Sequence, residues 1–457
     1  MIHPDLSSSI GRFSRRDFIR RSALATGSVA LGGGFGVRAD DASAPLNVAV
    51  IGLGGQGTVR LKEALAGGAN VVALCDVDEA LLAAATREAN AKTYTDFREL
   101  LKTETKLAAV IVATPDHWHA PIARAAMLAG KHVFCEKPLT RTIGEARALR
   151  ELARQSKVVT QMGNQGSASP NMRRAIELIQ GGAIGRVREV YLWTAPSHSF
   201  KPAQPMPTGE DPVPAGLHWD AWLGPAPARP YKQHLYHPKN WRAWYDFGGG
   251  SIADWGCHNF NLPFRALKLD YPTRIAADAQ IAGGECYSKG VRIRFEFAAR
   301  AELPPVTLWW FDGGRLPPEK MLPPEILAHL GKMPEDGVLL LGDEGFTYGS
   351  PHPGANYIML KGEKKLSDIL NHAATKDIAR SLPRVKGHME EWLTACRGGP
   401  APFSDFETGG KLTEIVLAGV VALRAGKKLH WDGIKMRATN TAAADPFIRA
   451  NYRAGWI

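Results

Sequence analysis

Short apolar runs alternate with helical patterns from residue 46 onward. Five runs of β-branched and other apolar residues lie at 46–51, 71–75, 107–113, 132–135 and 158–161. Stretches rich in Ala, Leu, Glu and Arg separate these runs. Strands that alternate with helices in this way predict a parallel, doubly wound sheet.

The second half of the chain has a different pattern. Three predicted strands, the last two antiparallel, lie at 187–194, 292–297 and 306–311. Gly342 and Gly345 mark a turn before another strand. Predicted helices lie at 386–396 and 406–425. The stretch 316–334 is rich in Pro, Lys and Glu, and we expect it to be a surface excursion.

A proline-rich segment interrupts this second half. Residues 196–230 contain nine prolines, which excludes a sheet interior or a long helix. An aromatic and imidazole cluster follows, made of Tyr231, His234, Tyr236, His237, Trp241, Trp244 and Tyr245. Two interpretations are open: Trp241 and Tyr245 line a substrate rim, or the aromatic rings staple a long loop to the core.

Composition narrows the class of protein. The 457 residues are 45% hydrophobic and 22% charged, which is typical of a globular protein of two or three domains and excludes a disordered chain. The net charge of +11 includes +4 from the first 39 residues, and no Lys/Arg run marks a nucleic-acid site. Five Cys without a C-x-x-C pair favour buried, reduced thiols.

The first 39 residues predict an export signal. Residues 14–20 carry the adjacent pair Arg15 and Arg16 before Phe18, and residues 22–37 are uncharged. This is the layout of a twin-arginine signal, and the uncharged run is too short for a stable membrane anchor. We therefore expect the twin-arginine machinery as a partner, cleavage after residue 39, and a periplasmic or otherwise extracytoplasmic destination.

A glycine-rich turn follows the first predicted strand. Residues 52–57 form G-x-G-x-x-G, in which Gly52, Gly54, Gln56 and Gly57 are placed to hold a pyrophosphate at a helix N-terminus. Asp76 ends the next strand and suits the adenosine ribose hydroxyls, which favours NAD over NADP. We expect an NAD-binding Rossmann domain over residues 40–165 and a second domain over 166–457.

Two further motifs lie where predicted strands end. Glu136, Lys137 and Pro138 follow the run at 132–135, and the carboxyl ends of parallel strands are where such sheets bind ligands. His117 and His119 lie two residues apart in the expected loop after 107–113. Zinc binding there is disfavoured because no Cys or acidic residue stands at ligand spacing, so we predict no metal site.

These motifs together resemble the Gfo/Idh/MocA oxidoreductases. The resemblance rests on residues 52–57, 114–119, 130–138 and 249–258, and it covers nearly the whole mature chain. It implies a Rossmann domain followed by an α/β domain with a large, mainly antiparallel open sheet. That sheet often forms an oligomer interface, so a dimer or tetramer is expected. Members of the family use NAD(P), and most act on sugars and cyclitols.

The resemblance assigns catalytic roles to Lys137, Asp254 and His258. Oxidation of a carbinol requires a proton acceptor, and a histidine is suited to this at neutral pH, so His258 is the expected general base. Asp254 either orients His258 or binds a second substrate hydroxyl. Lys137 is expected to donate a hydrogen bond to the reacting oxygen.

Further binding residues follow from the same resemblance. The loop with Thr114, Pro115 and His119 is expected to line the nicotinamide pocket, together with Glu136. Family members often continue as D-x-x-x-H-x-x-D, whereas this chain has Asn261 at the last position. Asn261 retains the capacity to hydrogen-bond a substrate.

Export adds a constraint on the mechanism. No NAD pool is maintained outside the cytoplasm, so we expect a tightly bound cofactor that is restored within each turnover. The leading hypothesis is an NAD(H)-dependent oxidoreductase acting on a carbinol of a sugar, cyclitol or sugar derivative.

Two alternatives stand beside it. One is the NAD-dependent glycosidase branch, which works by oxidation, elimination, hydration and reduction; that branch commonly has Glu-Val-Pro where this chain has Lys137. The other is a non-catalytic sugar-binding protein, against which Lys137, Asp254 and His258 all argue.

Overall fold

The computed structural model describes residues 45–195, 208–282, 284–351 and 356–456. The described residues all belong to one compact unit, residues 45–457. The predicted signal, residues 1–39, lies outside them, and the boundary that we place after residue 165 stays a prediction.

A six-stranded parallel sheet forms the first half, in the order β3-β2-β1-β4-β5-β6. Its strands are β1 (Asn47–Ile51), β2 (Asn70–Cys75), β3 (Lys92–Tyr94), β4 (Ala109–Val112), β5 (His132–Glu136) and β6 (Thr160–Gly163). The helices between them are α2 (Gln56–Ala66), α3 (Glu79–Ala85), α4 (Phe97–Thr103), α5 (Asp116–Leu128) and α6 (Ile143–Gln155). The predicted doubly wound sheet is confirmed. The sequence prediction missed β3, which has three residues, two of them exposed.

Side-chain caps explain where several of these helices begin. Asp78 and Asp96 accept the N–H groups that start α3 and α4. Thr142 and Glu145 form a capping box at the start of α6. Since the first N–H groups of a helix have no partner within it, these side chains fix the helix starts close to the carboxyl ends of the strands.

A ten-stranded sheet forms the second half, in the order β14-β13-β12-β11-β7-β10-β9-β8-β15-β16. Its strands are β7 (Glu189–Trp193), β8 (Arg274–Ile281), β9 (Lys289–Phe297), β10 (Val306–Asp312), β11 (Gly337–Leu341), β12 (Gly345–Gly349), β13 (Asn356–Leu360), β14 (Ser367–Asp368), β15 (Leu429–Asp432) and β16 (Arg437–Ala438). The pair β7 and β10 is parallel and every other pair is antiparallel. The large, mainly antiparallel sheet is therefore confirmed.

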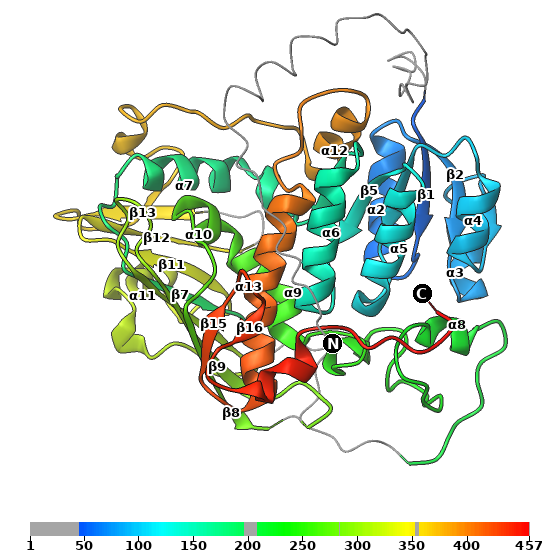
Figure 1. Cartoon of the computed structure of the whole chain (residues 1–457). Coiled ribbons are helices and arrows are strands. Elements are labelled where there is room, and N and C mark those ends of the chain that lie inside the picture. Colours follow the sequence, from blue (N-terminus) through cyan, green and yellow to red (C-terminus); the bar gives the residue numbers. More distant parts are fainter. Residues whose placement is uncertain (1–44, 196–207, 283, 352–355, 457) are drawn as a thin grey trace, which may run out of the picture. The chain divides into compact units, whose positions relative to one another are not determined.

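Helices cover one face of this sheet (Figure 1). They are α7 (Pro170–Gln180), α9 (Gly250–Asn259), α10 (Asn261–Ala266) and α13 (Phe406–Ala425). The helix α12 (His388–Cys396) packs instead against the first half, on α2. Within the described part of the chain, no helix combines the length and hydropathy that a bilayer span requires.

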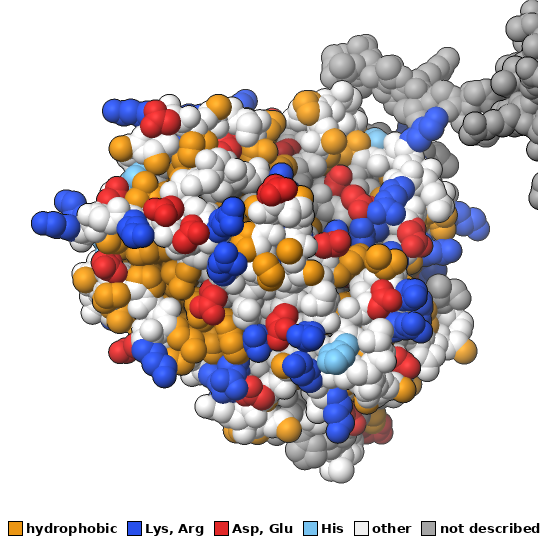
Figure 2. Space-filling view, turned by 60° about the vertical axis from the view of Figure 1, so that its left-hand side comes forward, with side chains coloured by type: hydrophobic (Ala, Val, Ile, Leu, Met, Phe, Trp, Pro, Cys, Tyr) orange, Lys and Arg blue, Asp and Glu red, His pale blue; other side chains and the backbone are white. Residues whose placement is uncertain are grey.

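The expected excursion at 316–334 is only partly a surface segment. It contains the helix α11 (Pro324–Leu330), and Leu322 and Ile326 are buried against the outer face of the large sheet. Apolar residues among the prolines and charges account for this difference. Figure 2 shows hydrophobic side chains gathered on the same half of the molecule. Oligomerisation through the sheet stays a prediction.

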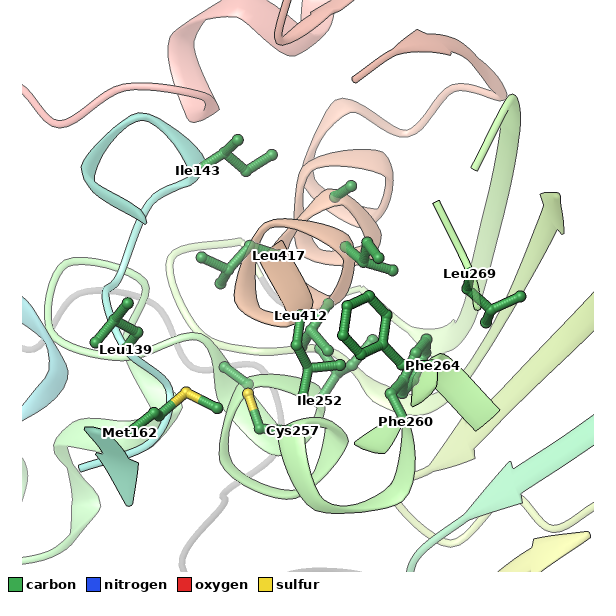
Figure 3. Packing of buried hydrophobic residues seen from close by; sticks show 14 of the residues in the cluster. Leu139, Ile143, Met162, Ile252, Cys257, Phe260, Phe264, Leu269, Leu412 and Leu417 are labelled. Atoms are coloured by element: carbon green, nitrogen blue, oxygen red, sulfur yellow. The ribbon is translucent and has the colours of Figure 1, made fainter. Parts of the chain in front are cut away.

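Helix α13 joins the two halves through the core. Figure 3 shows its Leu412 and Leu417 beside Ile252 and Cys257 of α9, with Met162 of β6 close by. All of these side chains are almost fully buried. Because protein interiors are packed as densely as organic crystals, this contact fixes α9 relative to the first sheet.

A buried carboxylate on α13 strengthens the same contact. Glu414, 1% exposed, accepts hydrogen bonds from Arg150 Nη1 (2.6 Å), Arg147 Nη2 (2.7 Å) and Tyr271 Oη (3.0 Å). Two arginines of α6 and one carboxylate of α13 therefore share a site with little water. Removing one member leaves uncompensated charge in the interior.

We expect Glu414→Gln to lower the free energy of unfolding by about 3 kcal/mol, because Arg150 loses its buried counter-charge. Glu151→Gln is the matched control, since Glu151 is exposed on α6, the helix that carries Arg150. It should change stability by less than about 0.5 kcal/mol. Denaturant unfolding of both variants is the measurement, and equal stabilities would contradict the role of Glu414.

Candidate active site

The turn after β1 accepts only glycine at two positions. Gly52 has a φ of +88°, and a Cβ there would lie 2.6 Å from the backbone of Ala113 and Thr114. A Cβ on Gly57 would lie 1.9 Å from the carbonyl oxygen of Gly52. Gly54 lies within the turn and Gln56 begins α2, whose first turn has no acidic residue. The turn thus presents a helix N-terminus suited to an anion.

Asp76 lies beside this turn at the end of β2. Its Oδ2 accepts the Leu53 N–H (2.7 Å) and its Oδ1 accepts the Asp78 N–H (3.0 Å). Burial raises the pKa of Asp76 to about 6, although the two backbone hydrogen bonds oppose the shift. The carboxylate is therefore ionised at neutral pH and keeps lone pairs for hydroxyl donors.

The turn after β4 contains the predicted residues Thr114 and Pro115, and the two histidines after it lie in a helix. Pro115 precedes α5, and Thr114 Oγ1 is buried without a hydrogen-bond partner among the described residues. The pair His117 and His119 lies in the first turns of α5, not in a loop as expected. His119 Nδ1 lies 2.7 Å from the Pro138 carbonyl oxygen and its Nε2 lies 2.8 Å from the Thr114 carbonyl oxygen, and the neutral ring donates a hydrogen bond from one of the two nitrogens.

Glu136 has a structural partner that the sequence did not reveal. Its Oε1 accepts a hydrogen bond from Arg60 Nε at 2.6 Å, and its side chain is 6% exposed. Arg60 lies on α2, three residues after the last glycine of the turn. This ion pair connects the glycine-turn helix to the strand that carries Lys137.

Lys137 and Asp254 meet although 117 residues separate them in the chain. Lys137 Nζ lies 2.6 Å from Asp254 Oδ1, with the side chains 16% and 18% exposed. Arg242 Nε lies 3.4 Å from the same oxygen. Burial alone would raise the pKa of Asp254, but Lys137 and Arg242 outweigh it and hold that pKa well below its usual range.

The charge of Lys137 follows from the same contact. Burial alone would lower the pKa of its ammonium, but Asp254 and Glu136 outweigh that effect and raise it. Both members of the pair are therefore ionised at neutral pH. A mostly buried cation with a fixed partner is a suitable hydrogen-bond donor to an oxygen that gains negative charge.

His258 lies one helical turn after Asp254 on α9, so both side chains share a face. Its Nδ1 lies 3.2 Å from Asn164 Oδ1, and Asn164 Nδ2 donates to the Cys257 carbonyl at 2.9 Å. The second bond fixes the orientation of the Asn164 amide, so Nδ1 is the donor to Oδ1. In the neutral ring, Nε2 then carries the lone pair.

His258 also lines a cavity. The cavity measures about 10 Å³, room for roughly one water molecule, and its lining includes Gly166, Ser169, Met172, His258 and Leu262. None of the three predicted substrate residues, Trp241, Tyr245 and Asn261, lines this cavity. A space of this size admits a water molecule to the His258 ring on the side of the large sheet.

Asp116 is a buried carboxyl group next to the ion pair. It begins α5, is 5% exposed, and accepts the Gly249 N–H in front of α9. Burial raises its pKa to about 8, while Arg242 opposes the shift and Asp254 adds to it. At neutral pH Asp116 is therefore largely protonated, and its proton is available for a hydrogen bond.

The three predicted substrate residues are engaged within the protein. Asn261 donates to Ser167 Oγ (2.9 Å) and accepts from Arg265 Nε (2.8 Å). Trp241 and Tyr245 are 6% and 5% exposed. Their contact with a substrate stays a prediction.

Sequence reasoning missed Arg60, Asp116, Asn164 and Arg242. Asp116 belongs to the quoted motif at 114–119, and Asn164 follows the last strand of the first sheet, so their positions after strands were available signals. Arg242 gave no such signal, because only the folded segment brings it to Asp254. Within the described residues, no three His, Cys, Asp or Glu side chains are grouped as a metal would require.

The residues fit an NAD molecule on three observations. The glycine cradle cannot accept a Cβ, the helix start beside it has no acidic residue, and Thr114 Oγ1 is a buried polar atom without a partner among the described residues. Asp76 is placed for ribose hydroxyls at the neighbouring strand end. These groups follow the carboxyl-terminal edge of the sheet, where such folds bind dinucleotides.

Comparison with known proteins identifies both halves of the chain. Residues 46–164 match a family model described as oxidoreductase family, NAD-binding Rossmann fold, and residues 191–303 match its C-terminal alpha/beta domain. A levoglucosan dehydrogenase of Pseudarthrobacter phenanthrenivorans is 36% identical over 121 residues, which cover 25% of this chain and 31% of that protein. A glycosyl hydrolase family 109 protein of Saccharopolyspora erythraea is 29% identical over 203 residues, covering 38% and 44%.

Solved structures show the same fold. An inositol dehydrogenase homolog of Azotobacter vinelandii, complexed with NADH and myo-inositol, superposes with a TM-score of 0.59 at 18% identity. The superposition covers 85% of this chain and 98% of that one. The sequence matches to the two relatives span less than half of each relative's own length. The two matched domains, together with the glycine turn and the two sheets, show that this chain belongs to the Gfo/Idh/MocA family of NAD-binding oxidoreductases.

Proposed function

We propose that this protein is an NAD(H)-dependent oxidoreductase that acts on a carbinol of a sugar, a cyclitol or a sugar derivative. The observation that supports this most is the 2.6 Å contact between Lys137 and Asp254, with His258 one turn further on the same helix. The contact brings Lys137, the donor for the reacting oxygen, to the helix that carries the candidate base His258, near the strand ends that suit a dinucleotide.

In this proposal His258 takes the hydroxyl proton at Nε2, because its Nδ1 is bonded to Asn164. Lys137 donates a hydrogen bond to the same oxygen and stabilises its developing charge. Asp254, held ionised, fixes the position of the Lys137 ammonium and accepts from a second hydroxyl. Bound NAD supplies the hydride acceptor for the carbinol carbon.

NAD contacts are proposed for the glycine turn, Asp76, Thr114 and Pro115. The roles of Glu136 and His119 are indirect in this geometry, since Arg60 and two backbone carbonyls occupy their polar atoms. Both residues act by fixing the turns that would face the nicotinamide. Asp76 favours NAD, since a 2′-phosphate would meet its negative charge.

The proposal that the substrate is a carbohydrate rests on the names of the relatives. Levoglucosan dehydrogenase and the inositol dehydrogenase homolog suggest a polyhydroxylated ring substrate. The glycosyl hydrolase family 109 relative supports the second candidate, a glycoside-cleaving enzyme. Lys137 favours the oxidoreductase, because the resemblance associates Glu-Val-Pro with the glycosidase branch, and this chain has Lys137 between Glu136 and Pro138.

Export, tight cofactor binding and a homo-oligomeric state complete the proposal. The basis for export is the sequence at 14–37 alone, and the basis for the oligomer is the open sheet of the second half. An exported oxidoreductase that restores its cofactor in each turnover needs two substrates, one to be oxidised and one to be reduced, whereas the glycoside-cleaving candidate oxidises and reduces the same molecule.

The purified protein should form bound NADH when it meets the right sugar or cyclitol, even without added NAD. We expect Lys137→Ala to slow this single turnover by about a hundredfold or more while NAD stays bound. Absorbance of bound NADH over a panel of sugars, cyclitols and aryl glycosides is the measurement. Lys157→Ala, at an exposed position, is the control, and full turnover in Lys137→Ala would refute the role of Lys137.

Affinity for NAD should fall as the pH is lowered through about 6. Asp76 is ionised above that value and accepts ribose hydroxyls; below it the carboxyl group is protonated and loses acceptor strength. Asp76→Asn should weaken NAD binding at pH 7.5 and remove this pH dependence. Calorimetric titrations of both proteins at several pH values check it, and parallel profiles would show that another group titrates.

Export should depend on the arginine pair. Arg15→Lys combined with Arg16→Lys should leave the protein in the cytoplasm, whereas Arg20→Lys with Arg21→Lys should not. Cell fractionation and immunoblotting distinguish the two pairs. Equal export of both would contradict a twin-arginine signal.

A further inference from the structure

Residues 216–247, here called the strap, run from the second half across the edge of the first sheet where its strands end (Figure 1). At the end of β2 an antiparallel β-bridge between Asp78 and Leu217 attaches it through two backbone hydrogen bonds, Glu79 N–H to Gly216 O (3.0 Å) and His218 N–H to Val77 O (2.9 Å). The His237 ring adds a contact, its Nε2 lying 2.9 Å from Asp78 Oδ2. These attachments lie within three residues of Asp76.

The strap is attached again beyond the glycine turn. The Trp118 indole N–H donates to the Trp222 carbonyl at 3.1 Å, and the His117 N–H donates to the Phe247 carbonyl at 3.2 Å. Both donors lie on α5, which follows β4. Since β1 lies between β2 and β4 in the sheet, the strap is fastened on both sides of the glycine turn. Its Arg242 then reaches Asp254.

The strap has a core of its own. Its buried members are Trp222, Leu223, Ala226, Tyr236, Trp241, Ala243, Trp244 and Phe247, joined by Cys286. Trp219 and Trp222 stack at 4.8 Å, and Trp222 meets Phe247 edge-on at 4.9 Å. Aromatic pairs of this kind add stability beyond the area they bury. The strap is therefore a folded element.

The chain's last described residues fasten the strap from outside. Arg453 binds Asp220 through Nη1 (2.6 Å) and the Gly224 carbonyl through Nε (2.9 Å), and its N–H donates to the Pro225 carbonyl (2.9 Å). Trp456 packs edge-on against Trp118 of α5. We call residues 452–456 the clasp. They tie the strap to the first half of the protein.

We propose that the strap and its clasp retain the dinucleotide, so that NAD leaves the protein only when the strap separates from the first sheet. A molecule reaching from Asp76 past the glycine turn to Lys137 follows the same path as the strap, between its two sets of attachments. This inference rests on the proposed NAD binding and adds the residues that govern retention. Arg453 and His237 act on cofactor exchange without touching the reacting atoms.

The test is the rate at which bound NADH escapes. Full-length protein loaded with NADH and freed of excess is diluted into a large excess of NAD, and the loss of bound-NADH fluorescence is followed. Arg453→Ala and His237→Ala should each release NADH about tenfold faster or more. Arg449→Ala is the matched control, because Arg449 is exposed in the same terminal segment and should release it at the wild-type rate.

Equal release rates in all four proteins would overturn the retention role, and so would failure of every form to bind NADH. The measurement needs no sugar, so it separates this inference from the proposed function. If the variants release NADH as expected but the protein oxidises no carbohydrate, only the proposed function is overturned. Sugar oxidation with unchanged release rates would overturn only the role of the strap.

Discussion

The ion pair of Lys137 and Asp254 is the constraint on which the site depends. Each side chain is less than one-fifth exposed, so each charge has lost much of its hydration and needs the other to remain ionised. The two residues come from different halves of the protein. Every contact that positions β5 against α9 therefore acts on the catalytic geometry, including the packing of α13 and the buried carboxylate of Glu414.

The sequence predicted the parts of the fold that have strong periodicity. The strands of the first sheet and the helix at 406–425 were predicted within a few residues, because apolar runs and caps mark them locally. In the second sheet only β7, β9, β10 and β12 were predicted, and β8, β11, β13 and β15 were missed. The edge strands β14 and β16, of two residues each, and the exposed strand β3 were missed as well, since their pairing is decided by neighbouring strands. The helix in 316–334 was missed because prolines and charges masked a few apolar anchors.

The site was predictable to the extent that its residues stand at strand ends or in recognisable motifs. Lys137, Asp254 and His258 meet these conditions, and the structure brings Lys137 and Asp254 into contact. Arg242 does not meet them, because its approach to Asp254 depends on the folding of an aromatic segment. Most of the aromatic rings of that segment pack on one another, which favours the interpretation that they hold a long loop against the core.

The ion pair between Arg60 and Glu136 fixes two parts of the proposed site relative to each other. Arg60 belongs to the helix that opens at the glycine turn, and Glu136 directly precedes Lys137. One short contact thus ties the proposed phosphate anchor to the proposed catalytic amine. The protein, and not the ligand, therefore sets the distance between these two groups before a cofactor binds.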